Sequence, residues 1–271
     1  MFLDSNTLLP SRPSSAMTYP DPIWTIRLLG TLKLESRFST ISHFRTRKTA
    51  SLLAYLALNP QNAHSRTKLI DLLWPDSHPS DGRNSLRVSL NALRSQLEPK
   101  ADLKGKVLLA LGDRLQLNSQ FCTTDVDRFQ QHLRDADRTA QQQKKIFHWQ
   151  EALKQYGGDL LPSDTSIWVE QEAGRLRDLH LATLCRLGQA LLGEGKNDLA
   201  LSYAGQAVQL DPLCETCHLL LMQVYVKLNR PARAIQQYQQ LKQIWALEFQ
   251  CLPSSALRHW VTRVLNINPD V

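Results

Sequence analysis

Residues 80–99, SDGRNSLRVSLNALRSQLEP, are the stretch that decides the fold of this 271-residue chain. Leucines recur there at steps of four, three and four, the spacing of a buried helix face, at Leu86, Leu90, Leu93 and Leu97. A second set follows the same rhythm on a neighbouring face: Arg83, Arg87, Asn91 and Arg94. Arginine and asparagine hydrogen-bond guanine and adenine edges, and a helix fits the major groove of DNA. The stretch predicts either a DNA recognition helix or an ordinary amphipathic surface helix with solvated arginines.

The segments around this helix predict a winged helix-turn-helix. Helical patterns with capping or breaking residues at their ends cover residues 46–58, 65–74 and 80–99. Strand, turn and strand patterns cover residues 23–34, around Gly30, and residues 107–117, around Gly112-Asp113. A small sheet, three helices and a hairpin follow one another in that order. The loop over residues 75–79 is long for the turn between the last two helices.

From about residue 124 the strand signals vanish and helical patterns follow one another. Two helices are expected in residues 125–156 and a longer one in 166–196. Lys196 and Arg230 are 34 residues apart, as are Ala200 and Ala234, and each alanine lies in a helical segment after a polar turn. This period is the tetratricopeptide pattern, whose stacked helix pairs form a curved surface that usually binds protein or peptide.

The positive charge is concentrated in the first part of the chain. The net charge is +7, yet residues 22–120 hold 15 Lys and Arg against 7 Asp and Glu, while residues 121–271 hold 16 of each. A basic unit joined to a neutral one predicts a polyanion partner for the first unit and a different partner for the second. No apolar run is long enough to span a membrane, so we expect a cytoplasmic protein with no membrane partner.

Nothing in the sequence predicts catalysis. There is no glycine-rich phosphate loop, no Gly-x-Ser-x-Gly and no His-Glu-x-x-His, and the eight histidines are scattered. The five cysteines do not form a disulfide framework. Cys214 and Cys217 have the spacing of half a zinc site without a second half, which favours reduced, partly buried thiols over a metal. We therefore expect no enzyme, no catalytic residue, no metal site and no cofactor.

The order and spacing of these segments match a known family. The matching segments are IRLLGTLKL, RKTASLLAYLALNP, SRTKLIDLLWPDS, GRNSLRVSLNALRSQL, TDVDRFQQHL, YGGDLLP, WVEQEAGRLRDLHLATL, LDPLCETCHLLLMQVYVKLNRPARAIQQY and LPSSALRHW. Over about Ile23 to Leu265 the chain resembles the Streptomyces antibiotic regulatory protein type of transcriptional regulator. That type has an OmpR-type winged helix followed by a bacterial transcriptional activator domain. Residues 248–252 depart from the family pattern, which leaves the local turn open.

The resemblance implies a mainly α fold, with an N-terminal winged helix-turn-helix of the α+β type and then an all-α, tetratricopeptide-like repeat domain. The expected division is a disordered tail over residues 1–22, the DNA-binding domain over 23–120 and the activator domain over 121–268. In this family the DNA sites are typically direct repeats near a promoter. The implied partners are therefore double-stranded DNA, a second copy of the chain on DNA, and RNA polymerase, contacted by residues 75–80 and the helical domain.

Two groups of residues are the candidates for DNA contact. The recognition helix is expected to present Arg83, Asn84, Arg87, Asn91 and Arg94 to the major groove. Phosphate and wing contacts are expected from Arg45, Arg47, Lys48, Ser65, Arg66, Lys68 and Arg114. The cluster at residues 45–48 is equally well explained as a solvated helix start, whereas Arg114 stands where a wing-tip arginine enters the minor groove.

A second interpretation comes from a different class of protein. A tetratricopeptide-like interaction adaptor with a non-specific or vestigial winged helix has the same order of elements. Such an adaptor should bind DNA weakly and without sequence preference. The charge concentrated in residues 22–120 argues against it and favours a sequence-specific transcriptional regulator, which the resemblance implies to be an activator.

Overall fold

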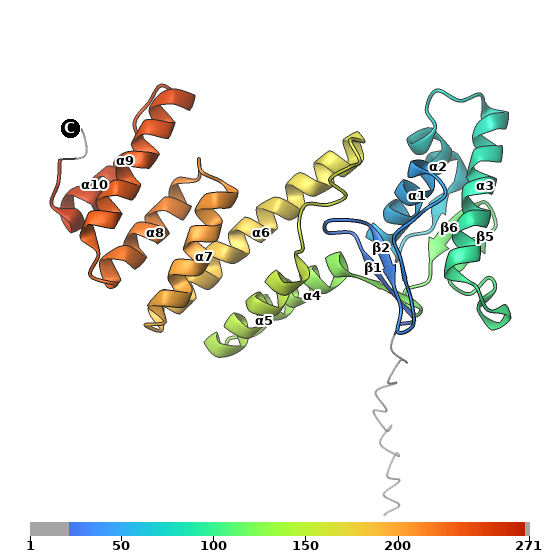
Figure 1. Cartoon of the computed structure of the whole chain (residues 1–271), viewed down its shortest axis with the longest axis horizontal. Helices are drawn as coiled ribbons and strands as arrows, with labels where there is room; N and C mark the ends of the chain where they lie inside the picture. The colour runs from blue at the N-terminus through green and yellow to red at the C-terminus, as the bar shows by residue number, and fades with distance from the viewer. Residues whose placement is uncertain (1–21, 269–271) are drawn as a thin grey trace, which may run out of the picture.

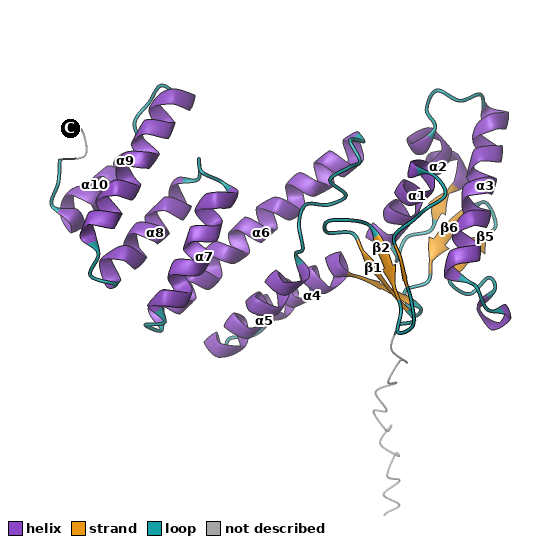
Figure 2. Ribbon diagram, viewed as in Figure 1, coloured by secondary structure: helices purple, strands orange, loops and turns teal. Residues whose placement is uncertain are grey.

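A computed structural model of the chain describes residues 22–268, so the tail expected over residues 1–22 lies, but for its last residue, outside the described residues. The strands gather at one end of the molecule, and successive helices extend away from them (Figures 1 and 2). The fold is mainly α, with an N-terminal winged helix and a helical repeat, as the sequence predicted. Within the described residues, no helix combines the length and apolar character needed to cross a bilayer.

A four-stranded sheet opens the chain, in the order β3-β2-β1-β7. Its strands are β1 (Trp24–Arg27), β2 (Lys33–Glu35), β3 (Thr40–Ile41) and β7 (Cys122–Thr124). The first two form the strand, turn and strand predicted around Gly30. The third and fourth strands were not predicted, and β7 pairs in parallel with β1 although the whole winged helix separates them in sequence. Along the chain, the three helices and the wing therefore lie between β3 and β7, two strands of the same sheet.

The three predicted helices are α1 (Arg47–Leu58), α2 (Arg66–Leu73) and α3 (Pro79–Leu97). The side chains of Thr46 and Ser65 cap α1 and α2. Both helices therefore begin where the sequence predicted. The link between α2 and α3 has the expected length but lies one residue earlier in the chain. His78 caps α3, and Pro79 takes the first helical position, where its missing amide costs nothing. Residue 79, predicted in the loop, thus belongs to the helix, and the link covers residues 74–78.

The wing is a hairpin of β5 (Leu108–Leu111) and β6 (Arg114–Leu117). Gly112, at a φ of +64°, supplies the left-handed turn that the Gly-Asp pair predicted. A two-residue strand, β4 (His64–Ser65), joins the hairpin as its third strand, and a short 3-10 helix (Ala101–Leu103) connects α3 to the wing. Since β4 runs directly into α2, the wing is fixed to the start of that helix.

The rest of the chain is a stack of antiparallel helices. They are α4 (Asp125–Arg138), α5 (Gln142–Gln155), α6 (Ile167–Gly193), α7 (Asn197–Leu210), α8 (Glu215–Lys227), α9 (Pro231–Glu248) and α10 (Ser255–Leu265). Neighbours along the chain pack side by side (Figure 1). Ala200 and Ala234 are fully buried in α7 and α9, and both helices begin directly after Lys196 and Arg230. The predicted 34-residue repeat is therefore confirmed.

The winged helix and the first helices of the stack share one hydrophobic core. The buried cluster that contains Ile26 and the α3 leucines continues through Phe129 of α4, Leu160 between α5 and α6, and Leu176 of α6. Asp125, 1% exposed, starts α4, and its carboxylate accepts the backbone amides of Leu28 and Leu29 at 2.9–3.0 Å. This junction holds the helical stack against the opening sheet.

Candidate nucleic-acid interface

Helix α3 has the two faces predicted from its sequence. Leu86, Leu90, Leu93 and Leu97 are at most 2% exposed and face the other two helices of the winged helix. On the neighbouring face Arg83, Asn84, Arg87 and Asn91 are exposed, while Arg94 is half-buried. The leucine seam is confirmed. The DNA contacts of the polar face remain a prediction.

One acidic residue lies near the cations of this face, because Asp71 of α2 lines the same hollow as Arg83 and Arg87. In the part of the chain that the structure describes, no ion pair includes Arg83, Arg87 or Arg94. Arg87 instead donates a hydrogen bond to the side-chain oxygen of Asn84 at 3.0 Å. Guanidinium groups left unneutralised on one exposed helix face create a positive surface that attracts phosphates and presents donors to base edges.

The start of α2 adds another cation to the same surface. Arg66 lines a hollow of about 450 Å³ together with Arg83 and Arg87, and Trp74 and Pro75 of the α2–α3 link close one side of it. The side chain of Ser65 accepts the backbone amide of Lys68 at 3.1 Å, so this oxygen is already used to cap the helix. A hydroxyl that accepts one hydrogen bond can still donate its own hydrogen, so Ser65 stays with Arg66 and Lys68 among the predicted phosphate contacts.

The wing lies beside the start of α2. Arg114 pairs with Ser65 across β6 and β4, and the amide of Arg66 donates to the carbonyl of Asp113 at 3.0 Å. The structure thus brings Arg114, which is exposed, together with Ser65, Arg66 and Lys68. From the sequence alone, these residues were placed in two separate elements.

The basic cluster at the start of α1 has a different setting. Arg45, Arg47 and Lys48 are exposed, and the last two line a hollow of about 470 Å³ with residues 163–166, which lead into α6. Ser51 of α1 donates to the carboxylate of Asp164 at 2.5 Å, and Lys48 interacts electrostatically with the same carboxylate. Arg47 and Lys48 therefore line the junction with the helical stack, whereas Arg66 lies beside the polar face of α3.

Two positioning residues were missed in the sequence. Trp24, in β1, donates its indole hydrogen to the carbonyl of Leu97 at 2.9 Å. Glu98, 6% exposed, accepts the backbone amides that lead into β5, at Gly105, Val107 and Leu108. Both contacts fix the end of α3. The only sequence signal was an acidic residue between an apolar helix and Pro99.

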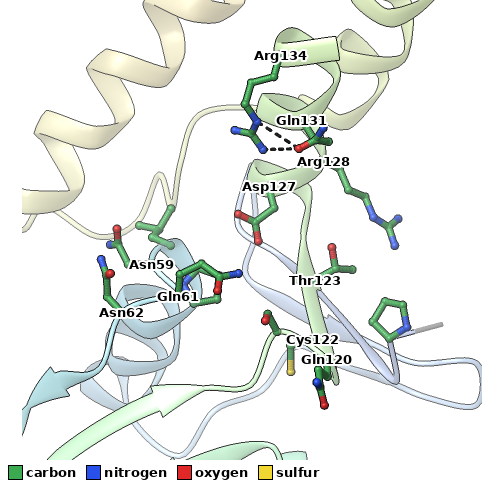
Figure 3. Close-up of a pocket in the computed structure, with 14 residues that line it drawn as sticks. Asn59, Gln61, Asn62, Gln120, Cys122, Thr123, Asp127, Arg128, Gln131 and Arg134 are labelled. Carbon is green, nitrogen blue, oxygen red and sulfur yellow. Dashed lines mark hydrogen bonds between the residues drawn. The ribbon is translucent and has the colours of Figure 1, made fainter. Parts of the chain in front are cut away.

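A polar hollow of about 840 Å³ lies at the junction between the two units (Figure 3). Asn59 and Asn62 line it from the α1–β4 loop, and Arg128 lines it from α4. Arg134 donates two hydrogen bonds to the side-chain oxygen of Gln131, also on α4. None of the residues assigned to DNA contact lines this hollow.

The Cys214–Cys217 pair is joined by a third thiol that sequence spacing could not show. Cys185 of α6 has its Sγ 3.3 Å from that of Cys217, and all five cysteines are free. Cys214 stands at the N-cap position of α8, and the Cys217 thiol together with backbone amides at the helix start lowers the pKa of Cys214 to about 6. The hydrogen bonds of the Cys217 thiol with Cys185 and Cys214, together with its burial, instead raise the pKa of Cys217.

A winged helix with an unneutralised cationic helix face, followed by a stacked helical repeat, defines the class of DNA-binding transcriptional regulators. Two family comparisons agree with this. Residues 124–265 match the bacterial transcriptional activator domain, and residues 44–108 match the C-terminal domain of transcriptional regulatory proteins. The chain belongs to the bacterial transcriptional activator domain family, with the winged-helix arrangement of the Streptomyces antibiotic regulatory proteins.

Relatives and a solved structure have the same organisation. The chain is 24% identical over 254 residues to the transcriptional regulatory protein MoaR1 of Mycobacterium tuberculosis, covering 89% of this chain and 79% of that protein, and equally to MoaR1 of Mycobacterium bovis. The structure of Mycobacterium tuberculosis EmbR in complex with a low-affinity phosphopeptide superposes with a TM-score of 0.77 at 22% identity. That match covers 90% of this chain and 65% of EmbR, so this chain spans only part of the EmbR length.

Proposed function

We propose that this regulator reads DNA with the exposed face of α3. Arg87, Asn91 and Arg94 contact base edges, and Arg83 and Asn84 complete the groove-facing set. The observation that carries this proposal is the row of arginines that form no ion pair within the described residues, on a helix whose other face is held by four buried leucines.

The phosphate contacts in this proposal come from both sides of α3. Arg66 and Lys68 approach one backbone strand, and Arg114 on the wing reaches the adjacent minor groove. Their support is the β4–β6 pairing, which fixes the wing to the start of α2. Arg45, just before α1, is a further phosphate contact. Arg47 and Lys48 also contact phosphate, although both line the junction with the helical stack beside Asp164.

We further propose that the chain divides into a DNA-reading domain over residues 23–120 and an activator domain over 121–268. One winged helix reads only a few base pairs, so two copies are expected on neighbouring direct repeats. The protein then activates transcription without catalysis of its own, by contacting RNA polymerase through residues 74–78 and the helical stack. The exposure of Pro75 and Asp76 at the tip of that link supports a protein contact there.

The test is to select bound fragments of genomic DNA with the full-length protein and then to footprint the enriched sites. Two protected half-sites in direct repeat are expected, with two chains bound. If about six phosphates are neutralised, log affinity should fall against log salt with a slope of about −5. A slope near zero, or equal affinity for random DNA, would overturn the proposal and favour the adaptor interpretation.

The polymerase contact is tested separately. Asp76→Ala should leave DNA affinity unchanged and reduce activated transcription in a reconstituted assay. Asp102→Ala, at an exposed position in the 3-10 helix Ala101–Leu103 and outside both the link and the helical stack, serves as the charge-matched control. Unchanged transcription with Asp76→Ala would remove the link from the proposed polymerase surface.

A further inference from the structure

The α4–α5 hairpin brings together two histidines that are far from the DNA-reading face in sequence. His132 and Asp135 are three residues apart on α4, and His148 and Glu151 are three residues apart on α5. Side chains three apart share a helix face, so each helix presents a histidine and a carboxylate on one side. The two helices pack against each other, and the histidines meet at their contact.

The distances fit a metal site. One ligand atom from each of His132, Asp135 and His148 lies within 4.8 Å of the other two, and all three residues are half-buried. The two Nδ1 atoms are 3.5 Å apart. Two imidazole nitrogens, each bound at about 2.1 Å to one tetrahedral ion, would stand about 3.4 Å apart. The side chains are therefore already close to the spacing that a shared ion requires.

Neighbouring side chains orient the ligand atoms of His132, Asp135 and His148 and affect the local charge. Gln131 donates a hydrogen bond to one carboxylate oxygen of Asp135 at 2.9 Å, which holds that carboxylate in place. Glu151 is near enough to interact electrostatically with His132, although it also pairs with Lys154 at 2.5 Å. Asp135 also pairs with the exposed Arg138 at 3.7 Å, so a bound divalent cation would compete with Arg138 and Lys154 for the two carboxylates.

We propose that His132, Asp135 and His148 bind a divalent transition-metal ion, with Zn²⁺ as the probe of choice. Two imidazoles and one carboxylate suit Zn²⁺, Co²⁺ or Ni²⁺, whereas Mg²⁺ and Ca²⁺ prefer oxygen ligands alone. A water molecule or Glu151 completes the coordination. Such an ion joins α4 to α5 and stabilises the first helix pair of the stack, which packs on the opening sheet through Asp125.

The experiment uses the full chain, freed of metal by a chelator and titrated with Zn²⁺ in a calorimeter and with Co²⁺ in a spectrophotometer. One ion per chain should bind, and Co²⁺ should show visible absorption without a thiolate charge-transfer band. His132→Gln and His148→Gln should each weaken binding at least about tenfold. His259→Gln, at an exposed position on α10, should bind like the unmodified chain.

Two outcomes would overturn the proposal. One is a thiolate band that disappears in Cys214→Ser, which would assign the ion to the cysteine cluster. The other is Zn²⁺ binding that is absent, or unchanged in both histidine variants. As a check on folding, Zn²⁺ should raise the melting temperature of the unmodified chain, and Asp135→Asn should abolish that rise while keeping the helical circular dichroism of the metal-free protein.

Discussion

The carboxylate of Glu98 accepts the backbone amide of Leu108 at 2.9 Å, which joins the end of the recognition helix α3 to the first residue of the wing. The same carboxylate accepts the amides of Gly105 and Val107 at 2.8 and 3.1 Å. Buried amides without an acceptor are costly, so one carboxylate that satisfies three of them fixes the wing relative to α3.

Replacing this carboxylate should destabilise the protein. In Glu98→Gln one oxygen is lost and an amide donor faces backbone donors, so the free energy of unfolding should fall by about 2 kcal/mol. Urea unfolding measures this. Glu248→Gln, an exposed residue at the end of α9, should change stability by less than about 0.5 kcal/mol. Equal effects of the two substitutions would show that Glu98 does not hold the wing.

Gly82 should resist replacement although it lies inside a helix. Alanine normally stabilises a helix interior by about 1 kcal/mol relative to glycine. At Gly82, however, an added methyl would lie 2.5 Å from the Cγ2 of Ile70 and 2.9 Å from the Oγ of Ser77. Overpacking of this kind costs about 1–3 kcal/mol, so the steric effect should win and Gly82→Ala should destabilise the protein by thermal unfolding.

The matched control for this substitution is Gly174→Ala in α6, where an added methyl meets nothing within 4 Å. It should stabilise the protein by about 0.5–1 kcal/mol because only helix propensity acts. A stabilising Gly82→Ala would mean that α2 and α3 are packed less closely than the structure shows.

The sequence was sufficient for the helices because their signals are local. The leucine spacing of α3, the caps at Thr46 and Ser65 and the Gly112 turn are each read within a few residues. The strands β4 and β7 could not be predicted, since two or three residues become a strand only when a distant partner is in place. The same reason hid the contacts of Glu98 and the meeting of His132 with His148.

In the candidate DNA site, too, some residues could be placed from local sequence patterns and others could not. The α3 arginines follow from helix periodicity, whereas the placement of Arg114 beside Ser65 depends on a long-range strand pair. The different settings of Arg66 and Lys48 depend on how the helical stack packs on α1. Sequence can therefore nominate basic residues, but tertiary packing determines which of them share a surface.

Arg87→Ala should weaken specific DNA binding by about 1–3 kcal/mol and relax base preference at the contacted position. Lys68→Ala should weaken binding to all sequences alike and make the salt slope about one unit less steep. Fluorescence anisotropy on the selected site and on a scrambled site separates the two effects.

The control is Arg233→Ala, which removes an exposed arginine of α9 far along the chain and should leave both affinities unchanged. Unaltered affinity and base preference in Arg87→Ala would show that another face of α3 contacts DNA.

Cys214 should react with alkylating agents at an unusually low pH. Its pKa is lowered to about 6, because the Cys217 thiol and the amides at the start of α8 stabilise the thiolate. The rate of iodoacetamide labelling at Cys214, followed by peptide mass spectrometry, should therefore be half-maximal near pH 6. A free cysteine peptide should reach this point near pH 8.5. Cys217→Ser should move the Cys214 profile toward that of the peptide, and a profile that rises only above pH 8 would contradict the prediction.

His180 should make the folded state sensitive to acid. Burial lowers its pKa to about 4, and its ring stacks on Tyr156 at a centroid distance of 3.9 Å. An unfolded histidine has a pKa of about 6.5, so between these values the unfolded state binds more protons than the folded state. The stability contributed by neutral His180 is therefore complete above pH 6.5 and is lost as the pH falls toward 4. The slope from this group should stay below about 1.4 kcal/mol per pH unit, because one histidine takes up at most one proton. Urea unfolding at pH 7, 6 and 5 should show a smaller acid loss in His180→Gln than in the unmodified chain or in His259→Gln. Parallel pH profiles for all three proteins would place the acid sensitivity elsewhere.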